Sequence, residues 1–137
     1  MTSPGKTEVR RLGLGDEAIV RRLAEGEPQT ALLADDRTIF LVAFRAAEPI
    51  GFVFGYELPR RHGNPSILFV YEVEVDAAWR GQEVATMLLR ELERIALSRG
   101  IREGFVLTEP DNEPALRLYA SLGGERVDSV MWDFAYA

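Results

Sequence analysis

The feature that most constrains the fold is a run of strand-forming residues joined by a polar turn to a long amphipathic helix. Residues Ile67–Val75 are rich in β-branched and aromatic side chains and predict a strand. A polar, glycine-containing turn follows, and residues 83–99 then repeat apolar side chains at the spacing of one helix face. Gly100 stands where this helix is expected to end. A helix of this kind must pack on a sheet or on other helices.

Further strand and helix patterns surround this unit. Strands are predicted at Thr7–Leu12, Thr38–Arg45, Ile50–Leu58 and Arg126–Phe134, with a buried strand at Gly104–Thr108. Helical segments are predicted at Glu17–Glu25, at Gln29–Ala34 and from Asp111-Asn112-Glu113-Pro114 to Leu122. The order predicts an α/β (α+β) domain with a mixed, mostly antiparallel central sheet flanked by helices. Residues 1–6 are expected to be a loose tail, and residues 7–137 a single domain.

Composition limits the classes of function. The formal net charge is −6, with 22 acidic and 16 basic side chains, which disfavours a nucleic-acid partner. The same charge favours a cationic substrate, although solubility alone accounts for it equally well. The sequence has no cysteine, no metal site is expected, and no apolar run approaches the roughly 20 residues that span a bilayer. A cytoplasmic protein without a membrane partner is therefore expected.

The turn between the strand and the long helix is a candidate anion site. Arg80, Gly81 and Gln82 immediately precede the helix. The first N–H groups of a helix have no partner within it, and together with the helix dipole they suit a phosphate or pyrophosphate. Most strand-to-helix turns bind nothing, so this pattern alone is a weak indication.

Two motifs resemble those of the GNAT N-acetyltransferases. The run Arg80-Gly81-Gln82-Glu83-Val84-Ala85 is similar to the acetyl-CoA loop of that superfamily, Arg/Gln-x-x-Gly-x-Gly/Ala. Asn112-x-x-Ala115-x-x-Leu118-Tyr119-x-x-Leu122-Gly123 is similar to its second motif. Further segments look like the aminoglycoside 3-N-acetyltransferase type I group: Gly55–Pro59, Tyr71–Val75, Leu107–Asn112 and Val130-Met131.

The resemblance implies the GNAT fold, acetyl-CoA as acetyl donor and direct attack by a primary amine on the thioester. The acceptor it implies is a small cationic amine such as an aminoglycoside, and it also implies a homodimer. By this resemblance the cofactor would be held by Val73, Val75, Arg80, Gly81, Gln82, Glu83, Val84, Ala85, Thr86 and Asn112. At Val73 and Val75 the backbone would make the contact. Glu109 and Asp111 would line an acidic rim for the substrate, although Asp111 or Asn112 could instead cap the helix.

Three residues are candidates for the chemistry. The resemblance places Tyr119 where the leaving thiolate is protonated, although this side chain could also be a packed aromatic on its helix. Glu72 and Glu74 are two residues apart on one strand and point to the same face, beside Leu68 and Val70. Mutual repulsion and burial are expected to raise the pKa values of both carboxyls, as a base near neutral pH requires. The resemblance to the type I group, which also has a carboxylate there, makes Glu72 the first choice and Glu74 the second; a solvated sheet face is the alternative.

Several residues carry a less specific signal. Glu83 stands where the GNAT loop usually has glycine, and it is expected to face solvent in the first helical turn; a lower cofactor affinity is the alternative. His62, the only histidine, is expected on a surface loop. Trp79 and Trp132 are expected to pack in the core. The competing functions are an acetyltransferase for another small amine, an amino acid or a protein N-terminus, and an acyl-CoA-binding module with little turnover.

Overall fold

The computed structural model describes residues 5–63, 65–81 and 83–137. Tertiary contacts divide the chain into a unit that ends at Leu107 and a second unit, Thr108–Ala137. The first unit holds the sheet. The second holds helix α3 (Glu113–Ser121) and then residues 124–137, which form neither helix nor strand. The expected single domain over residues 7–137 stays a prediction. No helix in the described ranges is long and apolar enough to cross a bilayer.

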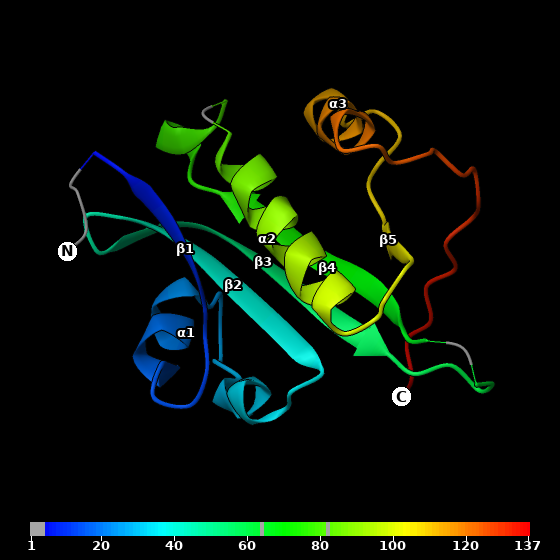
Figure 1. Ribbon diagram of the computed structural model, residues 1–137, viewed down its shortest axis with the longest axis horizontal. Coiled ribbons are helices and arrows are strands. Elements are labelled where there is room, and N and C mark those ends of the chain that lie inside the picture. The colour runs from blue at the N-terminus through cyan, green and yellow to red at the C-terminus, as the bar shows by residue number, and fades with distance from the viewer. Residues whose placement is uncertain (1–4, 64, 82) are drawn as a thin grey trace. The chain divides into compact units, whose positions relative to one another are not determined.

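The described residues of the first unit form a five-stranded sheet in the order β1-β2-β3-β4-β5 (Figure 1). The strands are β1 (Thr7–Arg11), β2 (Thr38–Arg45), β3 (Glu48–Leu58), β4 (Ile67–Val75) and β5 (Gly104–Val106). Neighbouring strands run antiparallel except β4 and β5, which are parallel. The predicted mixed, mostly antiparallel sheet is confirmed.

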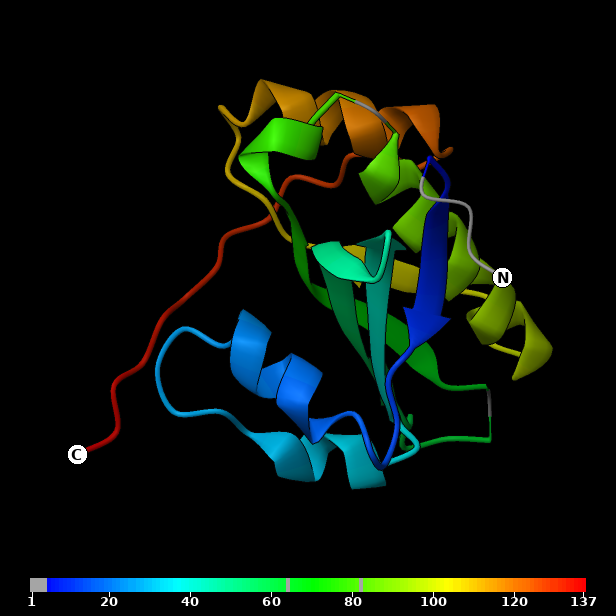
Figure 2. The same cartoon turned by 90° about the vertical axis from the view of Figure 1, so that its left-hand side faces the viewer.

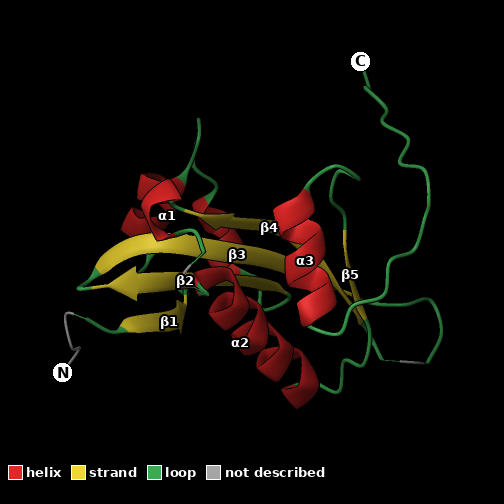
Figure 3. Cartoon of the chain, turned by 90° about the horizontal axis from the view of Figure 1, so that it is seen from above, coloured by secondary structure: helices red, strands yellow, loops and turns green. Residues whose placement is uncertain are grey.

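Helices cover both faces of this sheet. Helix α2 (Val84–Ser98) packs on one face, here called the α2 face, where its predicted apolar stripe joins Ile39, Leu41 and Val53 in a core (Figure 2). Helix α1 (Glu17–Leu23) and the short 3-10 helix η1 (Thr30–Ala34) cover the opposite α1 face (Figure 3). The buried residues of this second core are Leu12, Val20, Phe40, Val42 and Phe54. Alternate residues of β2 therefore serve two cores, which is why the strand is continuously apolar.

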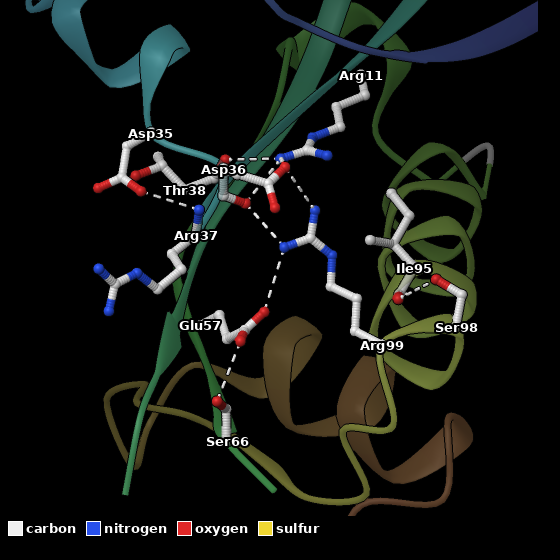
Figure 4. A network of polar contacts seen from close by, with 10 residues as sticks. All are labelled: Arg11, Asp35, Asp36, Arg37, Thr38, Glu57, Ser66, Ile95, Ser98 and Arg99. Atoms are coloured by element: carbon white, nitrogen blue, oxygen red, sulfur yellow. Dashed lines mark hydrogen bonds and ion pairs between the residues drawn. The ribbon is translucent and has the colours of Figure 1, made fainter.

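A polar network ties the end of α2 to both β2 and β3. Arg99 donates from Nη1 to the Asp36 carbonyl oxygen at 2.8 Å and to Glu57 Oε1 at 3.2 Å, and its Nη2 reaches Asp36 Oδ1 at 3.1 Å (Figure 4). Ser66 Oγ donates to Glu57 Oε2 at 3.0 Å. Arg99 and Glu57 are mostly buried, so this ion pair is screened less than one at the surface. The network anchors the end of the helix opposite the candidate site.

The largest differences between the predicted strands and the structure lie after α2, whereas the bounds of β1 and β3 differ from the prediction by one or two residues. The predicted strand Gly104–Thr108 ends at Val106, and Gly104 and Phe105 are exposed, because β5 has a neighbour on one side only. The strands predicted within Arg126–Phe134 do not form. Trp132, expected in the core, is 77% exposed. A strand needs an edge to pair with, and local sequence cannot supply one.

Candidate active site

A β-bulge interrupts β4 in the middle of the candidate site. Phe54 of β3 pairs with Glu72, but the next residue, Gly55, pairs with Val70, so Tyr71 has no partner on β3. An extra residue in one strand shifts the alternation of side chains beyond it by one position. Before the bulge the even-numbered residues of β4 therefore face α2, and after the bulge the odd-numbered residues do.

The bulge places both candidate carboxylates on the α1 face. Glu72 lies opposite Phe54, a residue of the α1-face core, and Glu74 lies two residues further on the same side. Leu68 and Val70 belong instead to the core under α2. The prediction that the two carboxylates share a face is confirmed, whereas their predicted position beside Leu68 and Val70 is wrong. The prediction assumes that side chains alternate along β4 without interruption, which would place both carboxylates on the face that α2 covers.

The environment of Glu72 favours its neutral form. Burial raises the pKa of the Glu72 carboxyl above its ordinary value, and the nearby charges of Glu74 and Glu25 raise it further. The direction predicted from the sequence is confirmed for this residue. Glu25, which follows α1, was not a predicted site residue, because only tertiary structure brings that segment close to β4. A carboxylate of this kind can accept a proton nearer to neutral pH than an ordinary glutamate.

Aromatic side chains adjoin the carboxylates on the α1 face. Tyr71, the bulged residue, has its ring centroid 5.8 Å from that of Tyr56, 6.3 Å from that of Phe54 and 5.6 Å from that of Phe69. Its side chain is 56% exposed. Burial raises the pKa of Tyr56, and the charges of Tyr71 and Glu72 add to the shift. An exposed ring next to acidic side chains is suited to a cation.

One edge of β4 is open within the candidate site. β5 pairs only with Leu68, Phe69 and Val70, and no other described strand pairs with that edge. Val73 and Val75 turn their side chains to the α2-face core, which leaves their backbone as the part that a ligand can reach. Unpaired N–H and C=O groups on a strand edge readily bind an extended polar chain.

The turn after β4 is held to the strand that precedes it. A short 3-10 helix, η2 (Ala77–Trp79), follows Asp76, and the Arg80 Nε then donates to the Val75 carbonyl oxygen at 3.0 Å. Trp79 packs against the α2-face core, and the Arg45 guanidinium lies 4.8 Å from its ring centroid. The prediction that Trp79 is a packing residue is confirmed. These contacts link the turn to β2 and to β4, so its backbone has a defined place relative to Glu72.

Helix α2 begins without a side-chain cap. Glu83 is its N-cap residue, is exposed, and makes no capping hydrogen bond through its side chain. The first N–H that bonds within the helix is that of Met87, to the Glu83 carbonyl oxygen at 3.0 Å, so the amides of Val84, Ala85 and Thr86 precede the hydrogen-bonded ladder. Such a helix start, with the positive end of the dipole, suits an anion.

The backbone of this turn explains why glycine suits position 83. Gly81 has φ +77° and Glu83 has φ +65°, both in the left-handed region. A residue with a Cβ is disfavoured there by about 1–2 kcal/mol. Glu83 faces solvent as predicted, but it precedes the first helical turn instead of lying in it. Gln82, also assigned to the cofactor, lies outside the described residues.

The second unit carries the remaining predicted residues. The Asn112 Oδ1 accepts a hydrogen bond from the Ala115 N–H at 3.2 Å, which makes Asn112 the N-cap of α3. Tyr119 is half-buried on this helix, and burial raises the pKa of its hydroxyl. Glu109 and Asp111 are exposed just before the cap. His62 is exposed on its loop in the first unit, as predicted.

Comparisons with known proteins bear on the family and the fold of this chain. Residues 7–123 match the model of the acetyltransferase (GNAT) family. An L-2,4-diaminobutyric acid acetyltransferase of Streptomyces coelicolor is 37% identical over 79 residues, which are 57% of this chain and 45% of that protein. The chain thus matches less than half the length of this curated relative.

Solved structures share the fold over nearly the whole chain. An aminoglycoside acetyltransferase from an uncultured soil metagenomic sample is similar at a TM-score of 0.88 and 25% identity, over 96% of this chain and 99% of that one. An aminoglycoside N-acetyltransferase in complex with CoA is similar in fold at a TM-score of 0.78 and 20% identity, over 96% of each chain. With a family model that matches most of its residues, this chain belongs to the acetyltransferase (GNAT) family.

Proposed function

We propose that this protein transfers the acetyl group of acetyl-CoA to a primary amine of a small cationic acceptor, with an aminoglycoside as the first candidate. The position of Glu72 is the observation that carries the proposal. This carboxylate has a raised pKa and lies on the strand whose open edge leads to the uncapped start of α2. A base, an edge for an extended ligand and an anion site thus follow one another between Glu72 and Thr86.

The residues present fit acetyl-CoA. The amides of Val84, Ala85 and Thr86, with Arg80 and Gly81, would hold the pyrophosphate, because they offer N–H donors and positive charge at a helix start. The backbone of Val73 and Val75 on the open edge of β4 would pair with the pantetheine arm. The Asn112 side chain caps α3 through Oδ1, and its amide NH₂ group is left as the donor for that arm.

Each candidate residue has a defined task in the reaction. When bound, acetyl-CoA supplies the activated acyl carbon and a thiolate leaving group. Glu72 takes the proton of the acceptor ammonium, directly or through one water, and Glu74 is the second candidate for this base. Tyr119 would donate its hydroxyl proton to the leaving sulfur, and burial raises the pKa of this hydroxyl. No protein nucleophile is required.

Charge and aromatic character support the proposed acceptor class. The charges of Glu74 and Glu25 act on Glu72, and Tyr71, the residue before Glu72, has an exposed ring. Acidic groups and an exposed ring favour an amine that is cationic before it reacts. Glu109 and Asp111 would add an acidic rim. The aminoglycoside 3-N type I group is the finer assignment that we propose. A diamino acid such as L-2,4-diaminobutyric acid is the second candidate, which the curated relative of that name supports.

An acceptor panel tests this proposal. Aminoglycosides, polyamines and diamino acids are incubated with acetyl-CoA while the released thiol is measured, and calorimetry reports acetyl-CoA binding separately. Aminoglycoside-dependent thiol release is the expected result. Release with diaminobutyric acid alone selects the second candidate. Acetyl-CoA binding without thiol release from any amine would instead favour an acyl-CoA-binding module.

A further inference from the structure

Trp79 is the only large apolar side chain in the turn that joins β4 to α2, residues 76–83. Its ring packs against the α2-face core. Its N–H donates to the Asp76 carbonyl oxygen at 2.8 Å, and the Asp76 N–H donates to the Ile50 carbonyl oxygen at 2.9 Å, which ties the turn to β3. The position of the Trp79 ring therefore influences the position of the backbone that leads into the candidate anion site.

The backbone after Trp79 needs support from outside the turn. Gly81 and Glu83 have positive φ values of 77° and 65°. A non-glycine residue in this conformation is strained, and the strain persists only where the surrounding structure holds it. Helix α2 also begins without a side-chain cap. Contacts from other parts of the fold are therefore needed to keep the first amides of α2 in a fixed arrangement.

Arg45, the last residue of β2, makes such a contact. Its guanidinium lies 4.8 Å from the centroid of the Trp79 ring, which is within the range of a cation–π interaction. Its Nη1 donates to the Thr7 Oγ1 at 3.1 Å, so the side chain is also held by β1. Arg45 thus connects the turn to two strands that are distant from it in the sequence.

The arrangement of Arg45 is costly for a side chain that only fills space. Its Nε is buried and donates to no partner among the described residues. No carboxylate in the described ranges forms an ion pair with this guanidinium. A buried donor without an acceptor and a covered charge without a counter-ion are both disfavoured. A methionine would cover the ring without either cost, so the charge of Arg45 is the property that calls for an explanation.

We propose that Arg45 is a positioning residue for acetyl-CoA, which acts by holding Trp79 and with it the turn whose amides would receive the pyrophosphate. The aromatic face attracts the guanidinium, and the positive charge next to the turn also favours an anion there. The inference rests on the proposed function, because it takes the turn as the cofactor site. Arg45 acts through another residue, so it should change cofactor binding and leave the chemical step unchanged.

Substitutions at position 45 test this role. Arg45→Met keeps the length of the side chain and removes its charge. The Kd for acetyl-CoA, measured by calorimetry, is expected to rise about 5–30-fold, the range that corresponds to a partly desolvated cation–π contact. The KM for acetyl-CoA should rise by the same factor, while kcat at saturating acetyl-CoA changes by less than about twofold. Arg45→Lys returns a cation to the ring and should recover most of the affinity.

Arg10→Met is the matched control. The Arg10 guanidinium lies 5.2 Å from the centroid of the Phe44 ring, so this variant removes a contact of the same kind that does not involve the turn. It should bind acetyl-CoA as the unmodified protein does. An equal loss of affinity in Arg10→Met and Arg45→Met would overturn the proposal. Unchanged affinity in Arg45→Met would overturn it as well.

Hydrogen exchange tests the positioning without the cofactor. The amides of Asp76, Trp79 and Met87 are hydrogen-bonded within or next to the turn. In Arg45→Met they should exchange faster, while the amides between β2 and β3 keep their rates. Equal acceleration of both sets would show a general loss of stability and overturn the proposal, as would unchanged rates at the turn.

The two proposals fail in different ways. An unmodified protein that binds no acetyl-CoA would overturn the proposed function and the role of Arg45 with it. An unmodified protein that binds acetyl-CoA, with the same Kd in Arg45→Met, would overturn the role of Arg45 alone.

Discussion

Glu72 lies opposite Phe54 across the β3–β4 pair, next to the bulge that leaves Tyr71 without a partner on β3. This relationship decides which side of the sheet carries the candidate base. Without the extra residue, Glu72 would point into the core under α2, where an unpaired carboxylate is strongly disfavoured. With it, the carboxylate lies on the α1 face near Glu74 and Glu25 and keeps a raised pKa.

Replacing Glu72 should remove the base. Glu72→Gln is expected to lower kcat/KM by about 10²–10⁴-fold, the usual contribution of general base catalysis. In the matched variant Glu74→Gln the loss should be smaller. Because the Glu74 charge raises the pKa of Glu72, that variant should also move the acidic limb of the pH–kcat/KM profile to lower pH. A larger loss in Glu74→Gln would make Glu74 the base.

The same group predicts a pH-dependent change in stability. A carboxyl whose pKa is raised in the folded state stabilises the fold below its unfolded pKa, and this contribution is lost as pH rises through the folded pKa. At pH values above the folded pKa of Glu72, Glu72→Gln should therefore melt at a higher temperature than the parent protein. Melting curves from pH 4 upward check the sign, because the difference in melting temperature between Glu72→Gln and the parent protein should become smaller toward low pH. A difference that becomes larger toward low pH contradicts the raised pKa.

Tyr119 should act as an acid through its hydroxyl alone. Tyr119→Phe keeps the ring and removes the proton, so kcat is expected to fall about 10²-fold, toward the low end for general acid catalysis. The melting temperature should change little, because the packing of the ring is retained. Tyr136→Phe, which alters an exposed tyrosine in the same unit, serves as the control and should leave kcat unchanged. Unchanged turnover in Tyr119→Phe would remove this role.

Two substitutions at position 83 separate charge from backbone strain. Glu83→Gly removes both and should raise the free energy of unfolding by about 0.5–1 kcal/mol, since glycine adopts positive φ without a Cβ clash but loses more entropy on folding. Its acetyl-CoA affinity, measured by calorimetry, should hold or improve. Glu83→Ala removes the charge and keeps the strain, so it should not gain this stability. A clear loss of affinity in Glu83→Gly would show that the glutamate side chain contributes to binding.

The β2–β3 hairpin contains a second strained position. Ala46 and Ala47 form its two-residue loop with φ values of 51° and 70°. Loops with positive φ at both positions favour Asn-Gly, so Ala46→Asn/Ala47→Gly should raise the free energy of unfolding by about 1–2 kcal/mol. Ala120→Gly inside α3 is the opposite control and should lower it by about 0.5–1 kcal/mol. Chemical denaturation measures both, and a less stable hairpin variant would contradict the prediction.

Much of the fold follows from local pattern. The spacing of Leu88, Leu92 and Ile95 predicted α2, and Gly100, with φ +76°, ends it as expected. Strands β2 and β4 have the predicted bounds because long runs of strand formers separate cleanly from the turns that flank them. The motif around Arg80 likewise identified the family, since its residues are adjacent in sequence.

The remaining features of the fold and the site depend on contacts between residues that are far apart in the sequence. The bulge at Tyr71 depends on how β4 aligns with β3, and the nearness of Glu25 to Glu72 depends on how α1 packs on the sheet. Strand-like residues after position 124 remain unpaired because a strand exists only beside another strand. Residue type and spacing thus predicted the helices, the turns and the side chains available for the reaction. Only the tertiary structure determines the face that each carboxylate occupies, because the register between β3 and β4 depends on residues that are far apart in the sequence.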